Sequence, residues 1–161
     1  MRHKLAIAFV IASTACITNI AYPADETQVA TFTVSHATSR DAATILRSIV
    51  GVKLEAADDH TLTVRGTKEN LELAAAVVKM LDTTDNTADT TPLPAGDGSV
   101  IAAVVLDRAS AEEVMDALRR ELRIARIATA GEKRVFLRDT DSQIQAALKV
   151  IGRVEDNHKG S

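Results

Sequence analysis

The first half of the chain has hydrophobic patterns that switch between the period of a strand and the period of a helix. Apolar and polar residues alternate over residues 31–35, as in a half-buried strand. Apolar residues recur at helical spacing over residues 42–50 and again over residues 71–81. Two short strands are predicted between these helices, over residues 52–56 and 61–65. The predicted order of elements is therefore β-α-β-β-α.

The second half repeats this order. Residues 100–106 read VIAAVVL, which predicts a strand that is apolar on both faces. Residues 112–122 and 142–154 carry apolar side chains at helical spacing. Two strands are predicted over residues 124–129 and 134–138, on either side of a turn that contains glycine. The second half is therefore also predicted to be β-α-β-β-α.

An internal repeat is the most informative feature of the sequence. With an offset of 72 residues, Leu46 aligns with Leu118 and Arg47 with Arg119. After the loop in the middle of each half, an offset of 73 fits better, and it aligns Arg65 with Arg138. We therefore predict an α+β protein of two tandem β-α-β-β-α units.

Composition marks the boundaries of these units. Residues 83–98 are rich in Thr, Asp, Pro and Gly without an apolar period, so they are predicted to form a linker or a long loop. The first unit is assigned to residues 29–82, the second to residues 100–156, and a polar tail to residues 157–161. Units of this size are marginally stable alone because they bury little surface. We expect them to pack on each other or on a partner, with the strand predicted over residues 100–106 as the contact surface.

The N-terminal segment has the order of a secretory signal peptide. Arg2 and Lys4 precede an apolar run at residues 5–12, and small and polar residues follow as far as Ala24. The apolar run is well short of the roughly 20 residues that a membrane-spanning helix needs. We predict export to the periplasm and removal of a signal peptide, assigned to residues 1–24, with cleavage after Ala24 or Ala21. The net charge would change from -3 to -5, because this segment holds two of the 19 basic residues and none of the 22 acidic ones.

The single cysteine, Cys16, lies inside this segment. One interpretation is that it is a small apolar residue of the signal peptide, and an exported chain would then have no disulfide. The alternative is lipidation, since residues 13–16 resemble a bacterial lipobox with Ser13 in place of the usual leucine. The protein would then be an outer-membrane lipoprotein, and membrane contact is expected in that case alone.

The stretch VRGTK at residues 64–68 joins a predicted strand to a predicted helix and raises the question of phosphate binding. A loop of the Gly-x-x-x-x-Gly-Lys-Ser/Thr type needs a second glycine, which is missing here. The equivalent residues of the second unit are Asp139 and Thr140, and a carboxylate would repel phosphate. We therefore interpret Gly66, Thr67, Asp139 and Thr140 as structural turn residues. Glycine and aspartate would share a left-handed backbone conformation, and each threonine would cap a helix.

These residues also carry a resemblance to a known family. LTVRGTKENL at residues 62–71, followed by Val77-Val78 and Leu81-Asp82, resembles the periplasmic N-domain repeat of bacterial secretins. The stretch VSHA at residues 34–37 resembles the opening strand and helix of that repeat. The resemblance covers residues 29–85 directly, and it extends to the second unit through the internal repeat.

The resemblance implies that each unit packs two helices on one face of a three-stranded sheet. In secretins such modules stack into periplasmic rings and contact other parts of secretion or pilus machines. For this chain the resemblance implies a pair of N-domains without the membrane-embedded β-barrel domain of a secretin. The expected function is protein–protein interaction in the periplasm, accessory to a secretin-type (type II) secretion system or a type IV pilus. The expected partners are ring components or other copies of the chain.

Other classes of function find less support in the sequence. His36, His60 and His158 lack metal-ligand spacing, and the serines lack the glycines of a nucleophile elbow, so neither an enzyme nor a cofactor is expected. A mildly acidic balance with few aromatic side chains argues against nucleic-acid binding. The alternative function is a small periplasmic ligand-binding or inhibitor-like protein, which would need a concave apolar pocket.

Basic residues concentrate in one stretch of the second unit. They form either a solvated helix end, where cations suit the helix dipole, or a contact for an acidic partner or a membrane surface. Two more arginines end equivalent strands in the two units. The candidate interface residues are Arg65, Arg138, Arg119, Arg120, Arg123 and Arg126.

Overall fold

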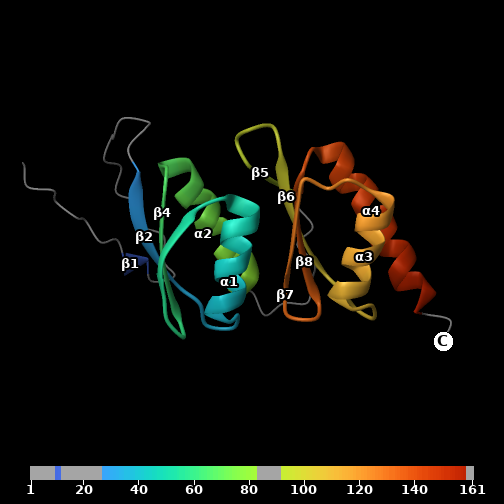
Figure 1. Ribbon diagram of the computed structural model, residues 1–161, viewed down its shortest axis with the longest axis horizontal. Coiled ribbons are helices and arrows are strands. Elements are labelled where there is room, and N and C mark those ends of the chain that lie inside the picture. Colours follow the sequence, from blue (N-terminus) through green and yellow to red (C-terminus); the bar gives the residue numbers. More distant parts are fainter. Residues whose placement is uncertain (1–9, 12–26, 83–91, 159–161) are drawn as a thin grey trace, which may run out of the picture.

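The computed structural model of the chain describes residues 10–11, 27–82 and 92–158 and has an α+β fold (Figure 1). Helices and two mainly antiparallel sheets make up the described residues, so the predicted fold class is confirmed. The elements in chain order are β1 (Val10–Ile11), β2 (Gln28–Thr33), α1 (Ser39–Ile45), the π-helix η1 (Leu46–Val50), β3 (Lys53–Ala57), β4 (Thr61–Gly66), α2 (Lys68–Asp82), β5 (Leu93–Pro94), β6 (Val100–Val105), α3 (Ala111–Glu121), β7 (Arg126–Ala130), β8 (Arg134–Asp139) and α4 (Asp141–Asn157).

The described strands form two sheets with matching orders. The first sheet has the order β1-β2-β4-β3 and the second β5-β6-β8-β7. The described pairs are antiparallel apart from β1 and β2, which run parallel. The expectation of three-stranded sheets was wrong, because a two-residue strand is added at the same edge of each sheet. Two residues are too few to show an alternating pattern, and β5 lies inside the predicted linker.

The elements are arranged in four layers (Figure 1). The first sheet is followed by a layer of α1, η1 and α2, then by the second sheet, and then by α3 and α4. For the first sheet and its helices, residues 27–82, we use the term N-terminal half; residues 92–158 form the C-terminal half. The helices of the N-terminal half therefore lie between the two sheets.

The second sheet is covered on both faces. Ile101 and Phe136 are fully buried in the same hydrophobic cluster as the helices of the N-terminal half. Ala102 and Val104 lie on the other face of this sheet, and they belong to the cluster formed with α3 and α4. The strand predicted over residues 100–106 takes part in the contact between the halves through Ile101, but β7 and β8 supply the rest of the contact surface, including Ala128, Ala130 and Phe136.

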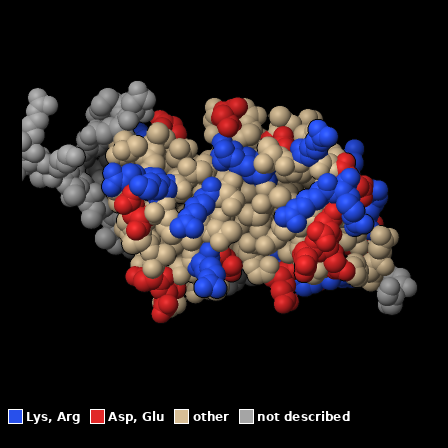
Figure 2. Space-filling model, viewed as in Figure 1, with Lys and Arg blue, Asp and Glu red and all other residues tan. Residues whose placement is uncertain are grey.

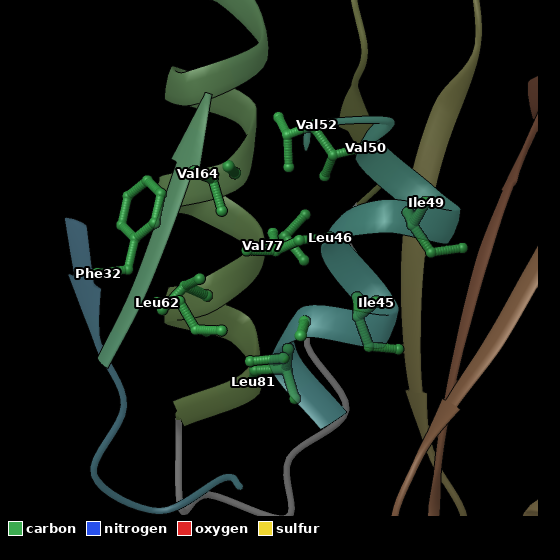
Figure 3. Packing of buried hydrophobic residues seen from close by; sticks show 14 of the residues in the cluster. Phe32, Ile45, Leu46, Ile49, Val50, Val52, Leu62, Val64, Val77 and Leu81 are labelled. Atoms are coloured by element: carbon green, nitrogen blue, oxygen red, sulfur yellow. The ribbon is translucent and has the colours of Figure 1, made fainter. Parts of the chain in front are cut away.

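The helix made of α1 and η1 is apolar toward both sheets. Ile45 and Ile49 point toward the second sheet, whereas Leu46 points toward α2 (Figure 3). All three are fully buried. Gly51 ends the helix as predicted: its φ is 89°, and its N–H donates to the Leu46 carbonyl oxygen at 2.9 Å. This bond closes the wider turn of a π-helix.

The first sheet, in contrast, is covered on one face. Ala30, Phe32 and Val34 point into the core, and the residues between them point away from it. The outward residues are mainly threonines, such as Thr33, which is exposed. Val29 is 38% exposed and is the one large hydrophobic side chain among the described residues that is exposed.

Candidate functional site

Three arginines of the C-terminal half reach helix ends of the N-terminal half. The Nη1 group of Arg138 donates to the carbonyl oxygens of Ile49 at 2.8 Å and Val50 at 3.2 Å. The Nη1 group of Arg126 donates to the Ile49 oxygen at 3.4 Å. Arg134 donates through Nη1 to the carbonyl oxygen of Leu81, near the end of α2. We call Arg126, Arg134 and Arg138 the junction arginines.

Their targets explain why cations belong at this junction. The last carbonyl groups of a helix have no partner inside the helix, and they carry the negative end of the helix dipole. A guanidinium supplies several donors in a fixed plane and remains charged at any physiological pH. The junction arginines therefore satisfy carbonyl groups that the second sheet would otherwise cover without a hydrogen bond.

Arg138 is held from its other side by the turn before β6. Its Nε donates to the Ser99 hydroxyl at 2.9 Å, and its Nη2 lies 2.8 Å from an Asp97 carboxylate oxygen. Hydrogen bonds from the hydroxyl and the N–H of Ser99, together with the Arg138 guanidinium, hold the pKa of Asp97 well below its usual range. Arg138 is 8% exposed, and its charge is balanced within the chain.

Arg65, at the equivalent strand end of the N-terminal half, has different surroundings. Its side chain is 46% exposed, and its Nε donates to a Glu55 carboxylate oxygen at 2.9 Å. This ion pair lies on the uncovered face of the first sheet. The structure thus places Arg65 at the surface and Arg138 inside the junction.

The remaining candidate interface residues lie at the end of α3. The Arg119 guanidinium is 3.8 Å from the Asp116 carboxylate, and Arg120 donates to the Asp116 carbonyl oxygen at 3.2 Å. Arg123 is exposed in the loop that follows. Basic side chains gather over this region, with acidic ones beside them (Figure 2). Arg126 leaves this group, because its guanidinium turns toward the junction.

The predicted turn residues have structural roles, but two expectations about them were wrong: Gly66 and Asp139 end β4 and β8 without a left-handed conformation, and the Thr140 side chain does not cap its helix. Gly66 does not adopt a left-handed conformation. It is needed for space: a Cβ there would lie 3.2 Å from a Val52 methyl carbon and 3.3 Å from the Asn70 Cβ. The Thr67 hydroxyl accepts the Asn70 N–H at 3.3 Å, as a helix cap does.

The equivalent turn of the C-terminal half uses its aspartate differently. Asp139 accepts the N–H of Thr140 at 2.7 Å and the N–H of Ala125 at 2.6 Å. The second bond ties down the chain before β7, which begins at residue 126 and not at residue 124 as predicted. Thr140 occupies the cap position of α4, but its side chain makes no capping hydrogen bond.

Each half also has a carboxylate that ties its second helix to the loop before its first helix. An Asp82 oxygen at the end of α2 accepts the N–H groups of Ser35 at 2.7 Å, His36 at 2.6 Å and Ala37 at 3.4 Å. Partial burial raises the pKa of Asp82, but these N–H groups outweigh it, and the pKa is lowered.

In the C-terminal half, Glu155 of α4 makes the matching contacts. It accepts the N–H groups of Arg108 at 2.9 Å and Ala109 at 3.3 Å. Asp82 and Glu155 are 73 positions apart, which is the repeat offset of this part of the sequence. Sequence reasoning missed this pair, although the alignment of two acidic residues at that offset was a usable signal. We call Asp82 and Glu155 the latch carboxylates.

A hollow of about 330 Å³ opens where the two halves meet. His36, Asp41 and Arg134 contribute its charged and titratable side chains, and Leu81 and Ala130 contribute apolar surface. It brings together the loop before α1, the end of α2 and the β7–β8 turn. Such a hollow was not expected from the sequence, because it forms between the halves.

No group of three or more His, Cys, Asp or Glu side chains is placed to hold a metal ion within residues 10–11, 27–82 and 92–158. Within the same ranges, no helix has the length and apolar character needed to cross a membrane. A scan against protein-family models finds no match to this chain, and a search of curated proteins finds none.

Proposed function

We propose that this chain is a protein-interaction module of the bacterial envelope, built from two tandem β-α-β-β-α units that resemble secretin N-domains. The observation that carries this proposal is the contact between the two halves. The helices of one half bind the sheet of the other through a shared hydrophobic cluster and the junction arginines. A unit of this kind can therefore bind another unit of its own kind, which supports a role in stacked assemblies.

A partner can bind only to candidate residues that are not buried in the contact between the two halves. Arg138 is buried in its contact with the N-terminal half, so we exclude it from an external interface. Arg126 also reaches the junction, but it stays exposed. Arg65 lies on the uncovered face of the first sheet, and Arg119 and Arg123 lie at the exposed end of α3. We propose these as the contact positions, with an acidic protein surface as the complement to the arginines of α3.

The proposed location is the periplasm, after removal of residues 1–24. Cell fractionation tests it, and the intact mass of the exported protein gives its N-terminus. A mass that begins at residue 25 supports the proposal. A mass that begins at a lipid-modified Cys16 supports the lipoprotein alternative, and a full-length cytoplasmic chain contradicts both.

Photo-cross-linking in cells tests the interaction role. A photoreactive amino acid is placed at Arg65 or at Arg123, with exposed Gln145 on α4 as the matched control. We expect envelope proteins of a secretion or pilus assembly to be captured at the first two positions and not at the control. Capture of no envelope protein at either position, from an exported and folded chain, would contradict the proposal.

The hollow between the halves supports a second candidate function, the binding of a small ligand. Its Arg134 and His36 side chains suit a small carboxylate or phosphate compound, although Asp41 at its rim opposes a second negative charge. A thermal-shift screen with small anions tests this, because a ligand that binds the folded state raises the melting temperature. An Asp41→Asn variant should strengthen a genuine anion effect, and the absence of any shift excludes this function.

A further inference from the structure

Three sheet edges carry features that discourage the addition of another strand. Natural proteins protect edges with charged side chains, proline, bulges or very short strands. β3 carries Lys53 and Glu55, and its pairing with β4 is interrupted by a register shift. β5 has two residues, one of them Pro94. β7 begins with Arg126, whose guanidinium is bonded at the junction.

The edge at β2 lacks all of these features. β2 reads QVATFT over six residues, with no charge and no proline, and its register with β4 is continuous. Of its residues, Thr31 and Phe32 pair with β1. The matching edge of the second sheet is covered by β5, at residues 93–94, which remain part of the chain after export. β1, in contrast, lies in the segment that we propose is removed on export.

We propose that β2 of the exported chain pairs with β2 of a second copy, antiparallel and about a two-fold axis. The inference rests on the proposed function, since it requires removal of residues 1–24. The parallel pairing with β1 shows that this edge has room for another strand. Because β2 is uncharged, two copies meet without like charges facing each other.

The pattern of β2 makes it self-complementary. In a register centred on Thr31, Ala30 lies opposite Phe32 of the second copy. Residues opposite each other in an antiparallel pair point to the same face, so Ala30 and Phe32 would lie on the core side in both copies. The first sheets of the two copies would then form one continuous sheet, in which β2 no longer has a free edge. A two-fold contact of this kind closes at the dimer.

Sedimentation equilibrium of the exported protein, over a range of concentrations, tests the proposal. The test variant carries Val29→Lys and Thr33→Lys, which face each other across the proposed pair. Both sites are exposed, but Val29 lies opposite Arg65 of β4, so circular dichroism of the test variant first checks that the fold is retained. The matched control carries Ala56→Lys and Ala57→Lys at the opposite edge, where both residues are also exposed. We expect a dimer whose association is weakened at least about tenfold in the test variant and unchanged in the control.

Hydrogen exchange gives a second readout on the same samples. Amides of β2 should be protected in the dimer and exchange faster in the test variant, with α4 unchanged. A monomer at every concentration, or a dimer that the test variant leaves intact, overturns the inference. An intact mass that still includes β1 overturns it as well. These results are independent of the cross-linking test, since capture of envelope proteins does not require a dimer.

Discussion

The outward face of each sheet, the one that points away from its own helices, is buried in one half of the molecule and exposed in the other. The repeat alignment places Thr31 and Thr63 of the first sheet on Ala103 and Phe136 of the second. The two threonines are partly buried and share a hydrogen bond of 3.1 Å on the uncovered face, whereas Phe136 is fully buried at the junction. The same position of the sheet therefore carries a polar side chain on an uncovered face in one half and an apolar side chain in a hydrophobic core in the other.

The arginines at the ends of β4 and β8 show the same division. Arg65 makes a surface ion pair, and surface pairs contribute little to stability. Arg138 satisfies buried carbonyl groups that water does not reach. The two halves thus have an arginine at the same position, but the contribution of that arginine to stability depends on whether it is exposed or buried.

The largest loss of stability is expected for Phe136→Thr, which removes the difference between the outward faces of the two sheets. This change gives the second sheet the residue of the first, removes a fully buried phenyl ring and buries a hydroxyl. We expect the free energy of unfolding to fall by about 3–5 kcal/mol. Urea unfolding followed by circular dichroism measures it. Thr63→Ala is the matched control, with an expected loss of about 1 kcal/mol. Similar losses for the two variants would contradict the assignment of the two faces.

Arg138→Met tests the junction arginines. Methionine keeps the apolar stem but leaves the carbonyl groups of Ile49 and Val50 without their donor, so we expect a loss of about 2–3 kcal/mol. Arg65→Met removes an exposed ion pair and should cost about 0.5 kcal/mol. Thermal and urea unfolding of both variants give the difference. If the two variants were equally stable, the junction arginines would have no special role.

The latch carboxylates are expected to differ in strength. Asp82→Asn weakens bonds from three N–H groups and should cost about 1–2 kcal/mol at neutral pH. Glu155→Gln weakens bonds from only two N–H groups and should cost about 0.5–1 kcal/mol. Urea unfolding at neutral pH ranks them. A larger loss at Glu155 would contradict the ranking by geometry.

The pH dependence of Asp82 sharpens this test. The pKa of Asp82 in the folded chain lies below its usual value of 3.8, so its charge stabilises the fold above that value. This contribution is lost as the pH falls through the lowered pKa. The stability difference between the native chain and Asp82→Asn should therefore be constant from pH 7 to about pH 5 and shrink below pH 4. Unfolding curves across this range measure it, and a difference that grew on acidification would contradict the sign.

The smallest effect is expected at the glycines. Gly66→Ala brings a methyl group within 3.2 Å of Val52, so we expect a loss of about 1 kcal/mol. Gly152→Ala, in α4, meets no atom within 4 Å and should stabilise the helix by about 0.5–1 kcal/mol. Melting temperatures should shift in opposite directions. A destabilised Gly152→Ala would show that α4 is under a constraint not apparent in its contacts.

The hydrophobic periods were enough to predict the α+β class and the long elements, because strands and helices bury one face with different spacing. The part played by β6 in the contact was predictable as well, since a strand that is apolar on both faces needs cover on both sides, whereas the larger part played by β7 and β8 was not predicted. The helix end at Gly51 followed from its position after an apolar period. These predictions depend on patterns that extend over several residues.

Features that depend on two or three residues, or on distant parts of the chain, were not predictable in this way. β1 and β5 are too short to have a period. The hollow exists only after the halves meet, and the burial of Arg138 depends on carbonyl groups about 90 positions earlier. Gly66 was expected to have a structural role, but it ends β4 and is needed for space, and a sequence does not distinguish a need for space from a need for a left-handed backbone.

The position of α1 and η1 between two sheets has a consequence for the order of folding. The chain is synthesised from its N-terminus, so the helix with Ile45 and Ile49 is complete before the strands that cover those side chains exist. Until Ile101 and Phe136 arrive, a folded N-terminal half presents an apolar surface to solvent. Partly folded chains with such surfaces aggregate readily. We therefore expect the chain to need a chaperone most while its N-terminal half is folded and its C-terminal half is still incomplete.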